Sequence, residues 1–551
     1  MTSPYPVPFT EVARKDRPRR LLVVGTAILL AMTLGAGAAW HPLLTAAARS
    51  SVNILGPSAT SLDPAAQSDA GSAQVVAQLF ECLTAVDAAS RVEPALAESW
   101  ETLDGGKRVV FHLRPDLTFS DGSALKASDV VSSWMRVLSP AHPSQLGSLL
   151  DEVTGARAYR EGTGQASAVG IHATSDSDVE VDMASPAVDF PAIASSPTLS
   201  VVPPGLDSNP ALLRPGTFVG SGGYVVSAVT ATETTLTANP HYWAGTPAIT
   251  TVHLLSSPSS DGEVADFQAG KLDYTPVTGD DATWIAYDNI LGPSLRLEPS
   301  PSVEFYGFNT TKAPFNDVHV RRAFELGIDW KRVVTLMAVP GMAPATGMVP
   351  TGVPGHSATD YGPVFDLATA KSELAAAGFA NGAGFPKVTL VTMGLDFDRL
   401  ERAIIAQLHV NLGIDISYQT LGWAAYNKQL MTDAPAFWEM DWVADYPGAN
   451  DFLGLLLGTG QTNNYGRWSN KDFDAALTTA LSSSDPSAMQ KAFDQAQSIV
   501  QDQAPVIPVD YGAEYGVPVL GEGYALVAGG LLGAMPNSQG MVRFAGMAWD
   551  G

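Results

Sequence analysis

The stretch that decides the fold is residues 437–447, which read FWEMDWVADYP. From Trp438 onward its side chains alternate between apolar and acidic, and this period of two predicts a half-buried β-strand. The apolar face of the strand holds Trp438, Met440 and Trp442. The other face holds Glu439 and Asp441, and Pro447 ends the strand.

A carboxylic acid, Asp445, follows at the mouth of this strand, between Trp442 and Tyr446. We expect a low local dielectric constant there, and a buried carboxylate is costly unless a cation or several hydrogen-bond donors meet it. We therefore expect the cation to arrive with a ligand, as an ammonium group. The alternative is an ordinary aspartate that opens a turn before Pro447 and Gly448.

The stretch resembles a signature of the family 5 solute-binding proteins of ABC importers, which include oligopeptide, dipeptide and nickel binders. The signature is a Trp-x-Ala-Asp-Tyr-Pro run, with Trp423 upstream and an Asn-x-Tyr segment at 463–465 downstream. Further matches occur in the family's order at 62–64, 79–83, 94–100, 111–115, 119–123, 239–245, 308–310 and 321–324. In peptide-binding relatives the acid matching Asp445 takes the α-ammonium group of the peptide, and the tryptophans matching Trp423 and Trp442 line side-chain pockets.

The resemblance implies an α/β, periplasmic-binding-protein-like fold of type II, cluster C, with two lobes and an extra domain. Lobe I would combine residues 46–86, 201–303 and 511–551. Residues 87–200 would form an inserted domain II, and residues 304–510 would form lobe II. Hinge closure between the lobes would bury the ligand. The predicted substrate-binding residues are Asp445, Trp442, Trp423 and Tyr446.

The implied function is delivery of a small peptide, by a monomer, to the permease and ATPase of an ABC importer. One position departs from the family pattern, because some peptide binders carry an arginine where this chain has Glu439. A negative charge there disfavours the carboxylate of a short peptide. A longer peptide, another partner such as Arg467, or another cargo is therefore implied, although a structural salt bridge is the favoured interpretation of Arg467. The alternatives on the same fold are a nickel-chelate binder, a glycan or lipid binder, and an envelope-anchored regulator that has lost transport.

The N-terminal segment predicts export. Residues 1–20 are rich in arginine and lysine and would stay in the cytoplasm, and residues 21–39 form an uncharged apolar run long enough to cross a bilayer. We favour a retained transmembrane anchor with the rest of the chain in the cell envelope. The alternative is a cleaved signal sequence, which would release the protein to the periplasm. Cys82 lies too deep in the chain to be a lipidated cysteine and is expected in the core.

Composition and motifs exclude several other functions. The 551 residues predict two or three domains, and a formal net charge of −25 argues against nucleic acid as a partner. There is no GxSxG or HExxH motif, and the nine histidines are too scattered for a helical metal pair. We therefore predict no enzyme activity, no catalytic residue, no metal and no cofactor.

Overall fold

The alternating stretch forms strand β17, Phe437–Val443, which ends four residues before Pro447. It lies inside a six-stranded sheet with the order β14-β18-β13-β17-β15-β16. The other strands of this sheet are β13 (Ser302–Phe308), β14 (Ala343–Pro344), β15 (Thr389–Met393), β16 (Ser417–Leu421) and β18 (Val506–Tyr511). Strand β17 runs antiparallel to β13 and parallel to β15, so it is a central strand over its first residues.

The structure is a computed structural model that describes residues 49–551 except 57–58, 68, 299–300, 338–341, 395–398, 484, 513–522 and 551. The predicted basic tail, 1–20, and the predicted transmembrane anchor, 21–39, lie outside the described residues. Within the described ranges, no helix combines the length and the apolar character that a membrane crossing needs. Ala48–Gly551 forms a single compact unit.

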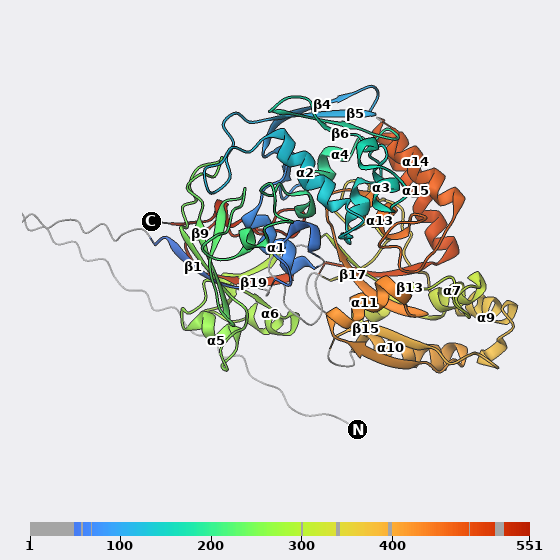
Figure 1. Ribbon diagram of the computed structural model, residues 1–551. Coiled ribbons are helices and arrows are strands. Elements are labelled where there is room, and N and C mark those ends of the chain that lie inside the picture. The colour runs from blue at the N-terminus through green and yellow to red at the C-terminus, as the bar shows by residue number, and fades with distance from the viewer. Residues whose placement is uncertain are drawn as a thin grey trace, which may run out of the picture. The chain divides into compact units, whose positions relative to one another are not determined.

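The two faces of the six-stranded sheet pack against different parts of the chain. The face that carries Tyr306 and Phe437 is covered by a helical layer, and Figure 1 shows α7, α9 and α10 on that side. The layer consists of these three helices and α8, with the bounds α7 (Val318–Gly327), α8 (Trp330–Met337), α9 (Leu367–Ala376) and α10 (Arg399–Gln407). The face that carries Trp438 and Trp442 joins a core that also includes α14 (Lys471–Leu481), α15 (Pro486–Gln503) and residues of predicted domain II.

A seven-stranded sheet, with the order β12-β19-β11-β1-β10-β9-β8, is assembled from three distant stretches of the chain. Its strands are β1 (Ser51–Leu55), β8 (Tyr224–Val229), β9 (Glu233–Ala238), β10 (Thr251–Leu255), β11 (Tyr274–Val277), β12 (Leu295–Glu298) and β19 (Gly523–Val527). All seven lie in segments that the sequence assigns to lobe I. Helix α1, Ala70–Leu79, shares the apolar core of this sheet.

A smaller four-stranded sheet, β4-β5-β7-β6, lies within predicted domain II. Its strands are β4 (Ala97–Leu103), β5 (Arg108–Leu113), β6 (Ile171–Ala173) and β7 (Asp178–Asp182). Helix α2, Ala127–Val137, packs on this sheet and buries Trp134. The division into lobes and a domain remains a prediction, and β13 begins at Ser302, two residues before the boundary that the sequence suggests.

Helix starts follow local capping chemistry. Helices α7, α9, α14 and α15 each begin after a residue whose side-chain oxygen accepts a backbone N–H of the first turn: Asp317, Asp366, Asn470 and Asp485. Such caps are readable from the sequence.

Candidate functional site

Asp445 lies two residues beyond the end of β17 and is partly exposed. Its Oδ2 atom is buried and has no hydrogen-bond partner in the part of the chain that the structure describes. Burial raises the pKa of Asp445 to about 7, and no described cation offsets this effect. The carboxyl group therefore occupies an environment in which an added positive charge would be strongly favoured.

A second acid, Asp451, supports this position from α12, Ala449–Phe452. Its Oδ2 atom accepts hydrogen bonds from the indole N–H of Trp442 (2.9 Å) and from the backbone N–H of Asp445 (3.1 Å). Its Oδ1 atom has no described partner, and the side chain is completely buried. Burial first, and the charge of Asp445 second, raise the pKa of Asp451 well above its ordinary value. Two carboxyl groups with one unpartnered oxygen each suit a protonated amine, which brings three donors.

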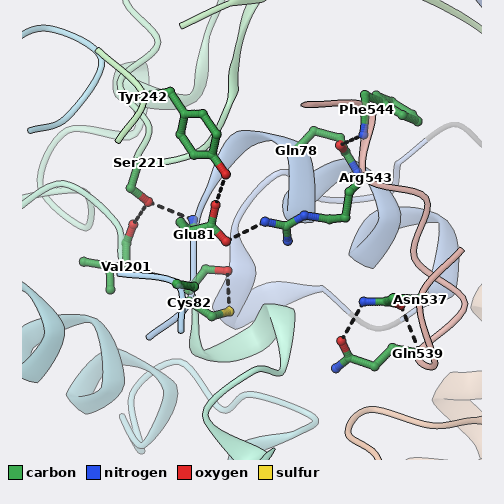
Figure 2. A network of polar contacts seen from close by, with 12 residues as sticks. Gln78, Glu81, Cys82, Val201, Ser221, Tyr242, Asn537, Gln539, Arg543 and Phe544 are labelled. Carbon is green, nitrogen blue, oxygen red and sulfur yellow. Dashed lines mark hydrogen bonds and ion pairs between the residues drawn. The ribbon is translucent and has the colours of Figure 1, made fainter. Parts of the chain in front are cut away.

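The backbone of Asp445 is held from the C-terminal segment of the chain. The side-chain amide of Gln539 donates to the carbonyl oxygen of Asp445 (2.7 Å) and makes a longer contact with the hydroxyl of Ser195 (3.4 Å). Asn537 shapes this loop, because its Oδ1 atom accepts the backbone N–H of Gln539 (2.9 Å). Figure 2 shows the Asn537 and Gln539 side chains together on the loop. Gln539 belongs to predicted lobe I, Asp445 to predicted lobe II and Ser195 to predicted domain II. The three predicted parts of the chain therefore meet at Gln539.

A buried polar network fixes the same C-terminal segment to α1 (Figure 2). The guanidinium of Arg543 pairs with Glu81 at 2.5 Å, and the hydroxyl of Tyr242 donates to the other carboxylate oxygen of Glu81 at 2.6 Å. The Oε1 atom of Gln78 accepts the backbone N–H of Phe544 (2.9 Å). The side chain of Glu81 is 1% exposed and that of Arg543 is 34% exposed, so a buried carboxylate meets a partly exposed guanidinium.

The predicted aromatic residues occupy different places. Trp442 is 9% exposed and donates to Asp451, so it lies next to the acid pair. Trp423 is the first residue of α11, Trp423–Asp433. Its side chain is partly buried and packs against the core that contains Trp438 and Trp442. Tyr446 is 1% exposed, and its side chain forms a hydrogen bond with Asp189 rather than with Asp445.

Tyr446 instead lines a cavity of about 190 Å³ that does not include Asp445. Polar side chains from two parts of the chain surround it, among them Glu152, Arg157, Asn450 and Asp474. The structure therefore brings Asp445 and Trp442 together, and directs Tyr446 to a neighbouring space.

A further polar group, which no sequence pattern indicates, surrounds Tyr465. Its hydroxyl accepts hydrogen bonds from Gln145 of predicted domain II and from Asn463, both at 3.1 Å. Its ring meets Trp438 edge-on, with 5.8 Å between ring centroids. The Trp438 Nε1 and Asn463 Oδ1 atoms are buried without a described partner, so a donor and an acceptor remain available beside this tyrosine.

The last residues of β17 present a strand edge. Strand β15 pairs with β17 only at Phe437 and Trp438. The N–H of Glu439 donates to the hydroxyl of Tyr426 (3.2 Å), and the same hydroxyl contacts the Glu439 carbonyl, so the backbone of Glu439 points away from β13. Backbone groups of alternate residues point the same way, which directs those of Asp441 and Val443 to the same side. No described strand pairs with them there.

Arg467 does not form the structural salt bridge that the sequence suggests. Its guanidinium is exposed and donates to the carbonyl of Met431 (3.3 Å), with no described carboxylate in ion-pair range. Neither Asp451, Gln539 nor Gln145 was predicted. Of these, only Asp451 carries a sequence signal, because it is an acid placed just before the apolar run at 452–457.

Comparison with known proteins places this geometry in a family. The family model "Bacterial extracellular solute-binding proteins, family 5 Middle" matches residues 91–464. A relative from Escherichia coli, the probable deoxycholate-binding periplasmic protein YgiS, is 32% identical over 464 residues, which cover 82% of this chain and 85% of the relative. The oligopeptide-binding protein OppA of Bacillus subtilis is 25% identical and covers the same shares.

Solved structures show the fold. The murein tripeptide binding protein MppA of Escherichia coli matches with a TM-score of 0.79 and 24% identity, over 91% of this chain and 98% of that chain. Haemophilus influenzae OppA in complex with RPPGFSPFR matches with a TM-score of 0.78 and 21% identity, over 91% and 99%. The α/β, periplasmic-binding-protein-like fold predicted from the sequence is confirmed. The chain belongs to family 5 of the bacterial extracellular solute-binding proteins, which serve ABC importers as binding components and are not enzymes.

Proposed function

We propose that this protein binds oligopeptides and holds the peptide's α-ammonium group at Asp445 and Asp451. The observation that carries the proposal is the pair of unpartnered carboxylate oxygens, Asp445 Oδ2 and Asp451 Oδ1. Both carboxyl groups hold protons more tightly than usual because burial leaves them without a compensating charge. A protonated amine would supply that charge together with hydrogen-bond donors.

The strand edge beside Asp445 supports a peptide rather than a simple amine. An extended peptide could add a strand to β17 through the backbone groups of Asp441 and Val443, which gives affinity that does not depend on sequence. Side chains of such a peptide would alternate between the two faces of the sheet. We expect Trp442 and Trp423 to line a pocket on one of these faces.

Contacts between distant segments support binding by closure. Gln539 of predicted lobe I donates a hydrogen bond to Asp445, and Gln145 of predicted domain II donates one to Tyr465. A ligand between these segments would favour the arrangement in which they meet, as in hinge-closing binding proteins. We infer that the protein works as an extracytoplasmic monomer that delivers its ligand to a permease and ATPase, anchored by residues 21–39.

A second cargo has one observation in its favour, since the relative at 32% identity is named as probably deoxycholate-binding. Deoxycholate is an anion with a rigid apolar body. The acid pair of Asp445 and Asp451 would repel its carboxylate, so the chemistry of this site favours the peptide. Direct comparison of the two ligands separates these functions.

The test is calorimetric titration of the exported part with tetra-alanine, N-acetyl-tetra-alanine and deoxycholate. We expect tetra-alanine to bind, and its N-acetyl form to bind roughly 10- to 100-fold more weakly, because one charged hydrogen-bonding group is lost. In Asp445→Asn the two peptides should bind about equally. Exposed Asp502→Asn serves as the matched control and should keep the full difference. Equal binding of both peptides to the unaltered protein would contradict the amine site.

A further inference from the structure

Four carboxyl groups gather on the face of the six-stranded sheet opposite Trp442. We call Glu304, Glu439, Asp441 and Asp510 the acidic row. Glu304 of β13 lies directly opposite Asp441 of β17 on one side and opposite Asp510 of β18 on the other. Glu439 precedes Asp441 by two residues and so shares its face. Three adjacent strands thus bring four acids into neighbouring positions.

The acidic row has no described cation. No lysine or arginine among the described residues forms an ion pair with any of its four members, and no group of three described acids, histidines or cysteines has metal-binding geometry. Asp510 is 3% exposed, and it forms a side-chain hydrogen bond with Glu304. Its Oδ2 atom is nevertheless buried without a described partner, and the neighbouring charge that acts on it is Asp441. A deep acceptor within the row is therefore unused.

The row is also accessible. Glu304, Glu439 and Asp441 are each partly exposed, although they lie between packed strands and helices. A nearby fifth acid, Glu401 of α10, accepts a hydrogen bond from Tyr306 (3.3 Å).

Acids placed this closely resist ionisation. Burial first, and then the charges of neighbouring acids, raise the pKa of Glu439 to about 8. The same two causes raise the pKa of Asp510 to about 8 and that of Glu304 well above its ordinary value. Burial raises the pKa of Asp441 to about 6. The row therefore holds protons near neutral pH, and a fixed positive charge would replace them.

The row adjoins the strand edge described above. Asp441 belongs to both, since its backbone faces the open side and its carboxyl group faces the row. A peptide strand added at this edge would direct every second side chain to the face of the row. Directly opposed residues on paired strands have Cβ atoms roughly 5 Å apart, within easy reach of a lysine or arginine side chain.

We propose that the acidic row is a subsite for one basic side chain, lysine or arginine, of the bound peptide. This inference rests on the proposed function and deepens it by naming the substrate class as basic peptides. It also gives Glu439 a role, because an acid at this position would exclude a peptide carboxylate and accept an ammonium or guanidinium.

The experiment is a lysine scan of tetra-alanine, with norleucine at the same positions as an uncharged match. At one position we expect the lysine peptide to bind roughly 10- to 100-fold more tightly than its norleucine analogue, the range for a charged hydrogen-bonding group. In Glu439→Gln and Glu304→Gln this ratio should fall toward one, while affinity for tetra-alanine stays within a few-fold of the unaltered protein. Asp502→Asn is again the control.

The outcomes are distinguishable. If tetra-alanine binds but lysine and norleucine peptides bind equally at every position, the basic subsite is overturned and the peptide function stands. A lysine preference that survives both substitutions would also overturn the assignment to the acidic row. If no peptide binds, the proposed function and the subsite both fall. Thermal melting confirms that the variants fold. Both isosteric changes should raise rather than lower the melting temperature, because they remove acids whose ionised form is disfavoured first by burial and then by neighbouring charges.

Discussion

The side-chain amide of Gln539 donates a 2.7 Å hydrogen bond to the backbone carbonyl of Asp445, across 94 positions of sequence. Gln539 is itself fixed by Asn537, and the same segment is tied by the ion pair between Arg543 and Glu81 to the residues that follow α1. The proposed amine-binding acid is thus held from the opposite lobe of the predicted architecture. Ligand binding and the approach of the two lobes should therefore be coupled.

Replacing Gln539 with leucine tests this coupling. The change keeps the approximate volume but removes the donor to Asp445, so the bound arrangement loses one hydrogen bond, worth about 0.5–1.5 kcal/mol. We expect dissociation of tetra-alanine to become roughly 2- to 12-fold faster, measured by stopped-flow fluorescence, with little change in association. Gln490→Leu, which alters a glutamine bonded to Gly355 and Asp494, is the control. Unchanged dissociation in Gln539→Leu would refute the coupling.

The ion pair of Arg543 and Glu81 should be a large contributor to stability. Arg543→Met leaves the 1%-exposed carboxylate of Glu81 without its cation. Because the guanidinium is itself 34% exposed, we expect a loss of about 1–3 kcal/mol, the cost of leaving a buried hydrogen-bonding group unsatisfied. Urea denaturation measures the loss. Adding Glu81→Gln should recover part of it, because the uncompensated charge disappears. A loss below about 1 kcal/mol in the single variant would show that water compensates the charge.

The acidic row should make the unliganded protein less stable as pH rises. Its carboxyl groups have higher pKa values in the folded than in the unfolded state, so the folded state retains protons that the unfolded state releases. Their contribution is fully present below about pH 4, the range of unfolded carboxyl groups, and is lost as pH rises through about 8.

Glu439→Gln isolates this effect from the other titrating groups. We expect the variant to gain on the order of 1–3 kcal/mol over the unaltered protein at pH 8 and close to nothing at pH 4. Urea denaturation at both values gives the difference. A gain that is equal at pH 4 and pH 8 would argue that the substitution acts through packing instead.

Binding of a lysine peptide should release protons. Because Glu439 and Asp510 have pKa values of about 8, both hold protons for part of the time at pH 7, and an arriving ammonium group would displace them. Calorimetry in two buffers with different ionisation enthalpies measures this release, and affinity should increase from pH 6 to pH 8. The norleucine peptide is the control and should release fewer protons. Proton uptake with the lysine peptide would contradict binding of its ammonium group at the acidic row.

Local sequence was enough to predict β17, because its alternation involves only neighbouring residues. Its place between Trp442 and Tyr446 drew attention to Asp445, while the family resemblance suggested a binding role for Trp442. The structure brings Asp445 and Trp442 together through Asp451. Family resemblance, rather than periodicity, predicted the fold class. The basic tail and the anchor concern residues that the structure does not describe.

The acidic row could not be predicted, because it depends on strand register between distant segments. Glu304 and Asp510 face each other only because the β13–β18 pairing shifts between Glu304 and Phe305. The contact of Gln539 with Asp445 could not be predicted either, since a glutamine in a turn carries no periodic signal. These residues depend on which strands and loops become neighbours, and a single sequence does not specify that.

The seven-stranded sheet places β19, from near the end of the chain, between β11 and β12, while β1, from near the beginning, lies between β10 and β11. A nascent polypeptide that stops before residue 523 would lack the strand that joins β12 to β11. Two rows of backbone groups would then stay open to water or to another chain. Completion of this sheet must therefore await synthesis of residues 523–527, and products that stop before them should be prone to aggregation and proteolysis.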